Sequence, residues 1–168
     1  PLLYLVNEGK EERIKIRMYQ TALGVDRMQL HEYVRLGVVD SMVAKLWGDL
    51  DSVRIISIHG KSVSQVMNIV QQHNPYMVIT DMTGRIRATT NRGGMNDISQ
   101  LEEVWNILRE EATLQDFLHM GTVQVSAEGF DMLYPPLSAM QNSKTGIQTT
   151  VDLAIMMGAL RDPQFNAL

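Results

Sequence analysis

Short apolar runs alternate with amphipathic helical patterns along the chain. The runs are rich in β-branched residues, and each ends in a turn or a polar break: 2–6, 53–58, 76–80, 122–126 and 151–157. Because their hydrophobicity is continuous, they predict strands covered on both faces, as in a parallel sheet. The sequence therefore predicts an α/β fold, with a mostly parallel sheet, right-handed crossovers and helices on both faces.

The segments between these runs have the spacing of amphipathic helices. Residues 10–23 end at Gly24, which predicts a C-cap glycine, and residues 40–50 repeat the apolar spacing. Two further helices are expected to begin with capping boxes, at residues 62–65 and 97–100.

The composition fits a single domain spanning residues 1–168, of which 45% are hydrophobic and 20% are charged. The absence of cysteine excludes disulfides and thiolate metal sites and suits a reducing compartment. No apolar run approaches the length of a membrane span, and residues 1–7 lack the basic start of a signal peptide. We therefore expect a cytoplasmic protein without a membrane segment.

The net charge of -4 gives the chain no overall positive field that would hold nucleic acid. Any contact with DNA must come from local groups of cations. Arg85, Arg87 and Arg92 gather around a glycine-containing loop, which suits phosphate contact with nucleic acid or nucleotide. A solvated loop is the alternative explanation of this group.

Two acids follow predicted strands directly. Glu8 comes just after residues 2–6, and Asp81 follows residues 76–80. Parallel sheets bind ligands beyond the carboxyl ends of their strands. There, Asp81 could hold Mg²⁺ through water and organise a nucleotide's phosphates, and Glu8 could deprotonate an attacking water. Alternatively, each acid stands after its strand only to remain solvated.

The ordered segments resemble the RecA-like motor domain of DnaB-type replicative hexameric DNA helicases, including those of phages. The resemblance covers nearly the whole chain. Glu8, in "VNEGKEERIKIR", matches the family's catalytic glutamate, and Asp81, in "YMVITDM", matches the magnesium-associated acid of the Walker B strand. The stretch "KTGIQTTVDLAIMM" is similar to the family's Gly-Ile-x-x-x-x-Asp-Leu pattern.

The resemblance implies a RecA-like P-loop NTPase core that hydrolyses ATP with Mg²⁺ between the subunits of a homohexameric ring. It further implies that single-stranded DNA passes through the ring. The match places a DNA-facing loop at Lys144, and in the intact helicase the loop near Arg92 is also expected to grip single-stranded DNA. The family's polar sensor corresponds to Gln124, and its arginine finger, which reaches the neighbouring subunit's nucleotide, corresponds to Arg161.

The last two assignments depart from the family pattern. The family places Gln or His at the end of the sensor strand, whereas Gln124 lies inside the predicted strand 122–126. It is either a sensor shifted in register or a strand residue facing a polar neighbour. Arg161 stands slightly later than the pattern expects, and is either the finger or a solvated residue at a strand end.

A third departure is the lack of a Gly-x-x-x-x-Gly-Lys-Ser/Thr phosphate loop in residues 1–168. Without the loop's N–H groups and lysine, the β and γ phosphates lose their cradle, so we expect this polypeptide alone to bind ATP poorly. We interpret the chain as a fragment that starts just after the loop. Half of a split protein and a degenerate relative are the alternatives.

Two other functions are compatible with the sequence. The first is a non-catalytic RecA-like module for oligomerisation or binding. The second is the core of a strand-exchange recombinase, which would share the fold and differ in its DNA loops and flanking domains.

Overall fold

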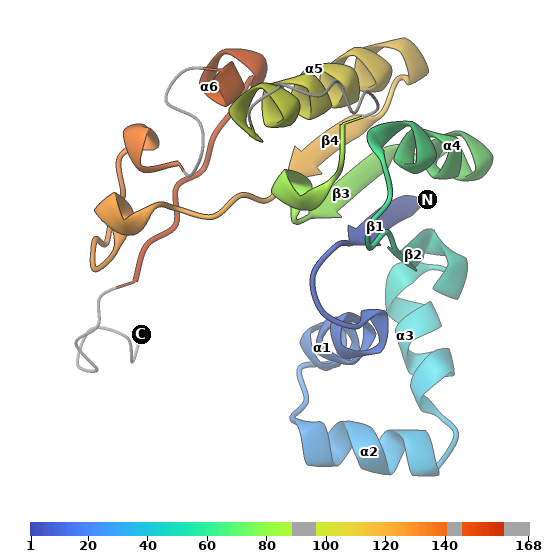
Figure 1. Cartoon of the computed structure of the whole chain (residues 1–168). Coiled ribbons are helices and arrows are strands. Elements are labelled where there is room, and N and C mark those ends of the chain that lie inside the picture. The colour runs from blue at the N-terminus through green and yellow to red at the C-terminus, as the bar shows by residue number, and fades with distance from the viewer. Residues whose placement is uncertain (89–96, 141–145, 160–168) are drawn as a thin grey trace.

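Four parallel strands form one sheet in the order β2-β1-β3-β4. The computed structural model describes residues 1–88, 97–140 and 146–159. The strands are β1 (Leu2–Val6), β2 (Val53–Ser57), β3 (Met77–Asp81) and β4 (Leu118–Gly121). Because all four run in the same direction, their carboxyl ends share one rim (Figure 1). The predicted parallel sheet is thereby confirmed.

Helices fill the connections between the strands. Between β1 and β2 lie α1 (Glu11–Leu23), α2 (Arg27–Arg35) and α3 (Val39–Trp47). The others are α4 (Val63–His73) before β3, α5 (Asp97–Gln115) before β4, and α6 (Gly146–Thr150) after it. Single 3-10 turns cover Leu50–Ser52, Thr83–Arg85, Ala127–Gly129 and Leu137–Ala139. Within the described ranges, no helix has both the length and the apolar character needed to cross a membrane.

The helix ends follow local capping rules. As predicted, α1 stops at Gly24, whose φ of 64° is left-handed, and a capping box between Ser62 and Gln65 starts α4. Helix α2 was not predicted, although Asp26 and Gln29 form a second capping box at its start. That pair was the available sequence signal for α2.

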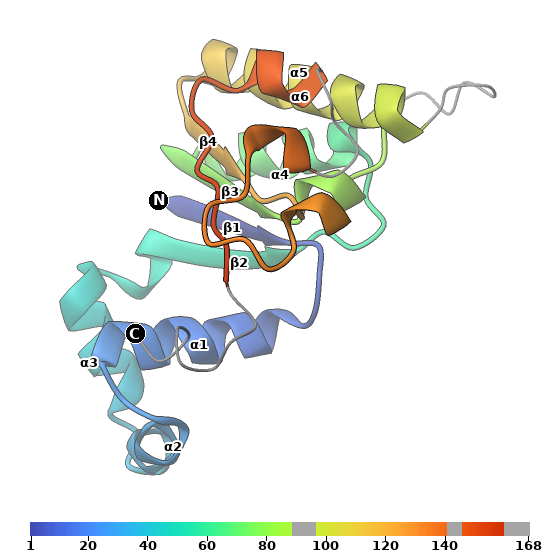
Figure 2. The same ribbon diagram turned by 90° about the vertical axis from the view of Figure 1, so that its left-hand side faces the viewer.

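The main core lies between the sheet and the helices α4 and α5. Its side chains are almost fully buried and come from both layers: Leu3, Leu5, Val66, Val70, Val78, Val104 and Leu108. On the opposite side of the sheet α1 packs against β2, so the expected helices on both faces are present (Figure 2). Helices α1, α2 and α3 share a second, smaller core around Tyr19 and Val43.

Two predicted strands are wrong. Strand β4 ends at Gly121. Beyond it the Thr122 backbone still bonds Thr80 and Thr83, and residues 122–126 otherwise contribute one isolated antiparallel bridge, between Val125 and Met140. Residues 151–157 run without strand structure and without a ladder partner among the described residues. Both segments have the composition of strands, but a strand also requires a neighbouring strand to bond with.

Gly121, the last residue of β4, is tightly packed. A Cβ atom at this position would collide with the Trp105 ring and with Oγ1 of Thr83. We therefore expect Gly121→Ala to lower the free energy of unfolding by about 1 to 3 kcal/mol through overpacking, measured by urea denaturation. Gly84→Ala is the matched control, because its added Cβ would meet only Leu101 at an ordinary 3.9 Å. Equal stability of the two variants would contradict this account.

Candidate active site

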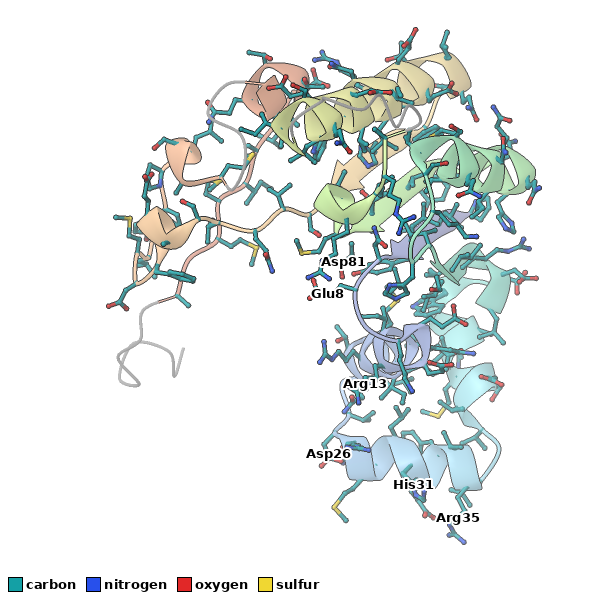
Figure 3. The ribbon with its side chains drawn as sticks, viewed as in Figure 1. Glu8, Arg13, Asp26, His31, Arg35 and Asp81 are labelled. Atoms are coloured by element: carbon teal, nitrogen blue, oxygen red, sulfur yellow. The ribbon has the colours of Figure 1, made fainter. Side chains whose placement is uncertain are left out.

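The structure brings the two predicted acids to the same rim of the sheet. β1 and β3 are adjacent and parallel, with Val6 paired to Asp81, and Glu8 lies two residues beyond Val6. Figure 3 shows Glu8 and Asp81 as neighbours at this rim. Glu8 and Asp81 therefore lie close together, as expected for residues that follow two parallel strands. The roles of the two acids stay predictions.

Asp81 is held by a donor on each side. The Tyr4 hydroxyl, from β1, donates to Oδ2 of Asp81 at 3.0 Å, and the Thr122 hydroxyl, just after β4, donates to Oδ1 at 2.8 Å. Burial, followed by the charge of Asp81 and the hydrogen bond to it, raises the pKa of Tyr4 to about 12. The phenol thus stays a neutral donor at physiological pH, and the orientation of the carboxylate is fixed.

This arrangement leaves acceptor capacity for a metal-bound water. Each oxygen of a carboxylate has two lone pairs, and Tyr4 and Thr122 each occupy one. In residues 1–88, 97–140 and 146–159, no group of three or more His, Cys, Asp or Glu side chains could hold a metal ion directly. Such a site suits Mg²⁺, which usually keeps several waters and binds through one or two carboxylates and substrate phosphates. Asp81 is the residue that would hold it.

Glu8 forms an ion pair across the rim. Nη2 of Arg85 lies 3.3 Å from Oε1 of Glu8, and the two side chains are 55% and 45% exposed, respectively. Exposed pairs of this kind contribute little stability and break readily. Glu8 is therefore accessible to a ligand, with a cation beside it.

The loop that carries Glu8 is pinned to both neighbouring strands. The backbone N–H of Asn7 donates to the Asp81 carbonyl at 2.5 Å, and the Asn7 side chain, which is buried, donates to the Met82 carbonyl at 3.4 Å. On the β2 side, Nε2 of His59 bonds the Gly9 carbonyl at 2.7 Å. The two Asn7 bonds continue the β1–β3 contact beyond the strands, and the His59 bond ties the loop to the segment after β2. Together they hold the backbone on both sides of Glu8.

A buried polar chain supports β3 from the α5 side. The hydroxyls of Thr80 and Thr83 lie 2.5 Å apart, and Nε2 of His119 lies 3.0 Å from Thr80 Oγ1. The His119 ring packs against Trp105, with centroids 5.6 Å apart. Burial lowers the pKa of His119 to about 4, so the imidazole is neutral near pH 7.

The other predicted site residues have different outcomes. Gln124 is exposed and lies three residues beyond the end of β4, so its placement inside a strand is wrong. Its role as the polar sensor stays a prediction. Arg92, Lys144 and Arg161 lie outside the described residues.

Sequence reasoning missed Tyr4, Thr122 and the partnership of Arg85 with Glu8. The one available signal was Tyr4 itself, a single phenol in an otherwise aliphatic strand, two residues from each strand end. The surface hollow on α2 that Arg27, Met28, His31 and Glu32 line belongs to another part of the molecule. It does not include the rim acids.

The fold is similar to that of a known protein, although the sequence matches none of the families or curated proteins. No family model matches the chain, and no curated protein matches its sequence. The chain is similar to a solved structure of a DnaB-like replicative helicase, described together with its interactions with primase. The TM-score is 0.67 at 19% sequence identity, and the match covers 90% of this chain but only 38% of the helicase chain. The chain therefore has an α/β fold, a four-stranded parallel sheet with flanking helices, that is similar to the matched part of that helicase chain.

Proposed function

We propose that the chain is part of the motor domain of an ATP-dependent replicative DNA helicase. The supporting observation is the presence of Glu8 and Asp81 at one rim of a parallel sheet, in a fold similar to that of a DnaB-like helicase. Fold alone does not establish activity, and the two acids supply the chemical argument.

Asp81 would organise the phosphate end of the nucleotide. Its carboxylate, oriented by Tyr4 and Thr122, would accept hydrogen bonds from the waters of Mg²⁺. Asp81 would be the residue that holds Mg²⁺, and the chemistry that the ion would supply is neutralisation of negative charge on the phosphates.

Glu8 would accept a proton from the attacking water. Its side chain lies on the same rim as Asp81, and its ion pair with Arg85 is weak enough to yield to a ligand. Gln124 would serve as the polar sensor after β4, and Arg161 of an adjacent subunit would contact the γ phosphate.

The intact protein would be a homohexameric ring with ATP between its subunits. Because the site would draw residues from two chains, hydrolysis would be coupled to motion between subunits. Loops near Arg92 and Lys144 would grip single-stranded DNA and move it through the ring. The intracellular location expected from the sequence is consistent with this function.

Calorimetric titration with ATP and Mg²⁺ tests the proposal on two proteins: this chain and the longest protein that its gene encodes. We expect weak binding by residues 1–168, which lack a phosphate-loop motif, and tight Mg²⁺-dependent binding with unwinding of a forked duplex by the longer protein. Tight binding by residues 1–168 alone would show that no further cradle is needed. Failure of the longest protein to bind ATP would refute the motor function.

The lack of a phosphate-loop motif in residues 1–168 also favours a second candidate, a non-catalytic RecA-like oligomerisation or binding module. The same titration separates the two, because a module would oligomerise without ATP. Filament formation on DNA would instead indicate the recombinase core.

A further inference from the structure

Arg85 belongs to a turn that is anchored on both sides of it. The N–H of Thr83 donates to the Thr122 carbonyl at 3.2 Å, and the N–H of Ile86 donates to the Thr83 carbonyl at 3.0 Å. Thr83 is fully buried and Ile86 is almost so, whereas the side chain of Arg85 is 55% exposed. The buried residues therefore fix the backbone of the turn and leave the guanidinium in solvent at the rim of the sheet.

Glu8 is the partner of this guanidinium in the structure. Nη2 of Arg85 lies 3.3 Å from Oε1 of Glu8. Glu8 follows β1 and Arg85 follows β3, so the ion pair joins two separate segments beside Asp81 (Figure 3). A half-exposed pair of this kind adds little to stability. The pair therefore contributes little to holding the fold, and a stronger ligand can displace either member.

A guanidinium binds carboxylates and phosphates with the same geometry. Its planar fork of donors matches the oxygens of either group, and these charge-assisted hydrogen bonds are stronger than neutral ones. A terminal phosphate carries up to about two negative charges and three acceptor oxygens, whereas a carboxylate carries a single charge. A terminal phosphate at this rim is therefore a stronger ligand for Arg85 than Glu8 is.

We infer that Arg85 binds the terminal phosphate of a nucleoside triphosphate, and that Glu8 occupies its guanidinium when no nucleotide is bound. This role rests on the proposed motor function, which puts the phosphates beside Asp81. When the phosphate binds, Arg85 exchanges Glu8 for it, and the carboxylate is released to face the attacking water. A nucleoside diphosphate lacks the competing group and leaves the pair between Glu8 and Arg85 in place.

Calorimetric titration of the longest protein that the gene encodes tests this role with two ligands. One is adenylyl imidodiphosphate, a triphosphate analogue that resists hydrolysis, and the other is ADP. We expect Arg85→Gln to weaken binding of the analogue roughly 10-fold or more, the effect of losing a hydrogen bond to a charged group, and to leave ADP affinity unchanged. Arg85→Lys should recover part of the loss, because the ammonium keeps the charge without the planar fork.

Arg35→Gln is the matched control. Arg35 also forms an exposed ion pair with a glutamate, Glu32 on α2, and the two side chains are 66% and 48% exposed, respectively. Figure 3 shows Arg35 well away from Glu8 and Asp81. The replacement breaks the same kind of contact outside the rim, so this variant should bind both nucleotides like the unaltered protein.

The outcomes separate the role of Arg85 from the proposed function. If the unaltered protein binds the analogue tightly and Arg85→Gln binds it equally well, the phosphate contact is overturned and the motor function stands. An equal loss of affinity for the analogue and for ADP would also overturn it, because the contact would not be to the terminal phosphate. If the unaltered protein binds neither nucleotide, the motor function and the role of Arg85 are both refuted.

Discussion

Replacing Glu8 by glutamine is expected to lower the rate of ATP hydrolysis by roughly 10²- to 10⁴-fold, the range that a positioned general base contributes. The amide keeps the shape of the side chain and cannot accept the proton of the attacking water. Binding of ATP with Mg²⁺ should persist, because Asp81 and its two donors are untouched. Steady-state hydrolysis and nucleotide affinity, measured on the longest protein that the gene encodes, provide the two readouts.

Glu12→Gln is the matched control for this experiment. Glu12 is exposed in the first turn of α1 and undergoes the same change of charge four residues along the chain. It should hydrolyse ATP at the unaltered rate. If Glu8→Gln behaved like Glu12→Gln, Glu8 would be a solvated strand-end acid and the base would have to be sought elsewhere.

Acidification is expected to destabilise the fold through His119. Its pKa is about 4 in the folded chain and 6.5 as an ordinary imidazole. Between these values the unfolded chain binds a proton that the folded chain excludes, so the free energy of unfolding falls as the pH drops from 6.5 to 4. The stabilisation is fully present above pH 6.5, and the loss is about 3 kcal/mol once the pH has passed the folded value.

Urea denaturation across this pH range measures the effect. Carboxylates titrate in the same window, so the informative quantity is the difference between the unaltered chain and His119→Gln. The variant should show a shallower fall in stability below pH 6.5. His31→Gln, at an exposed position on α2, is the control. A pH dependence of His119→Gln identical to that of the unaltered chain would contradict burial as the cause.

The strands β1, β2 and β3 were predictable, and the edge strand β4 was not. Residues 2–6 and 76–80 are continuous apolar runs with strands on both sides, so composition and environment agree. β4 is "LHMG", which lacks β-branched residues, whereas the following "TVQVS" has them and lies outside the sheet. β4 is a strand because it pairs with β3, and this pairing is a tertiary effect.

The candidate site also has a part that was predictable from the sequence and a part that was not. The sequence predicted Glu8 and Asp81 at one rim, because each follows a strand and the carboxyl ends of parallel strands lie at the same edge of the sheet. The partners of these acids depend on register and on loop paths. Tyr4 reaches Asp81 only because β1 pairs with β3 in the observed register, and Arg85 reaches Glu8 only through the turn after β3.

The two hydrogen bonds to the Asp81 carboxylate depend on how the neighbouring strands are aligned. One donor, Tyr4, comes from β1, and the other, Thr122, directly follows β4, so the contacts of Asp81 depend on the segments on both sides of β3. A one-residue slip of β1 would turn Tyr4 to the other face and strip one oxygen of its donor. The infrared stretch of the isotope-labelled Asp81 carboxylate should shift when that hydrogen bond is lost.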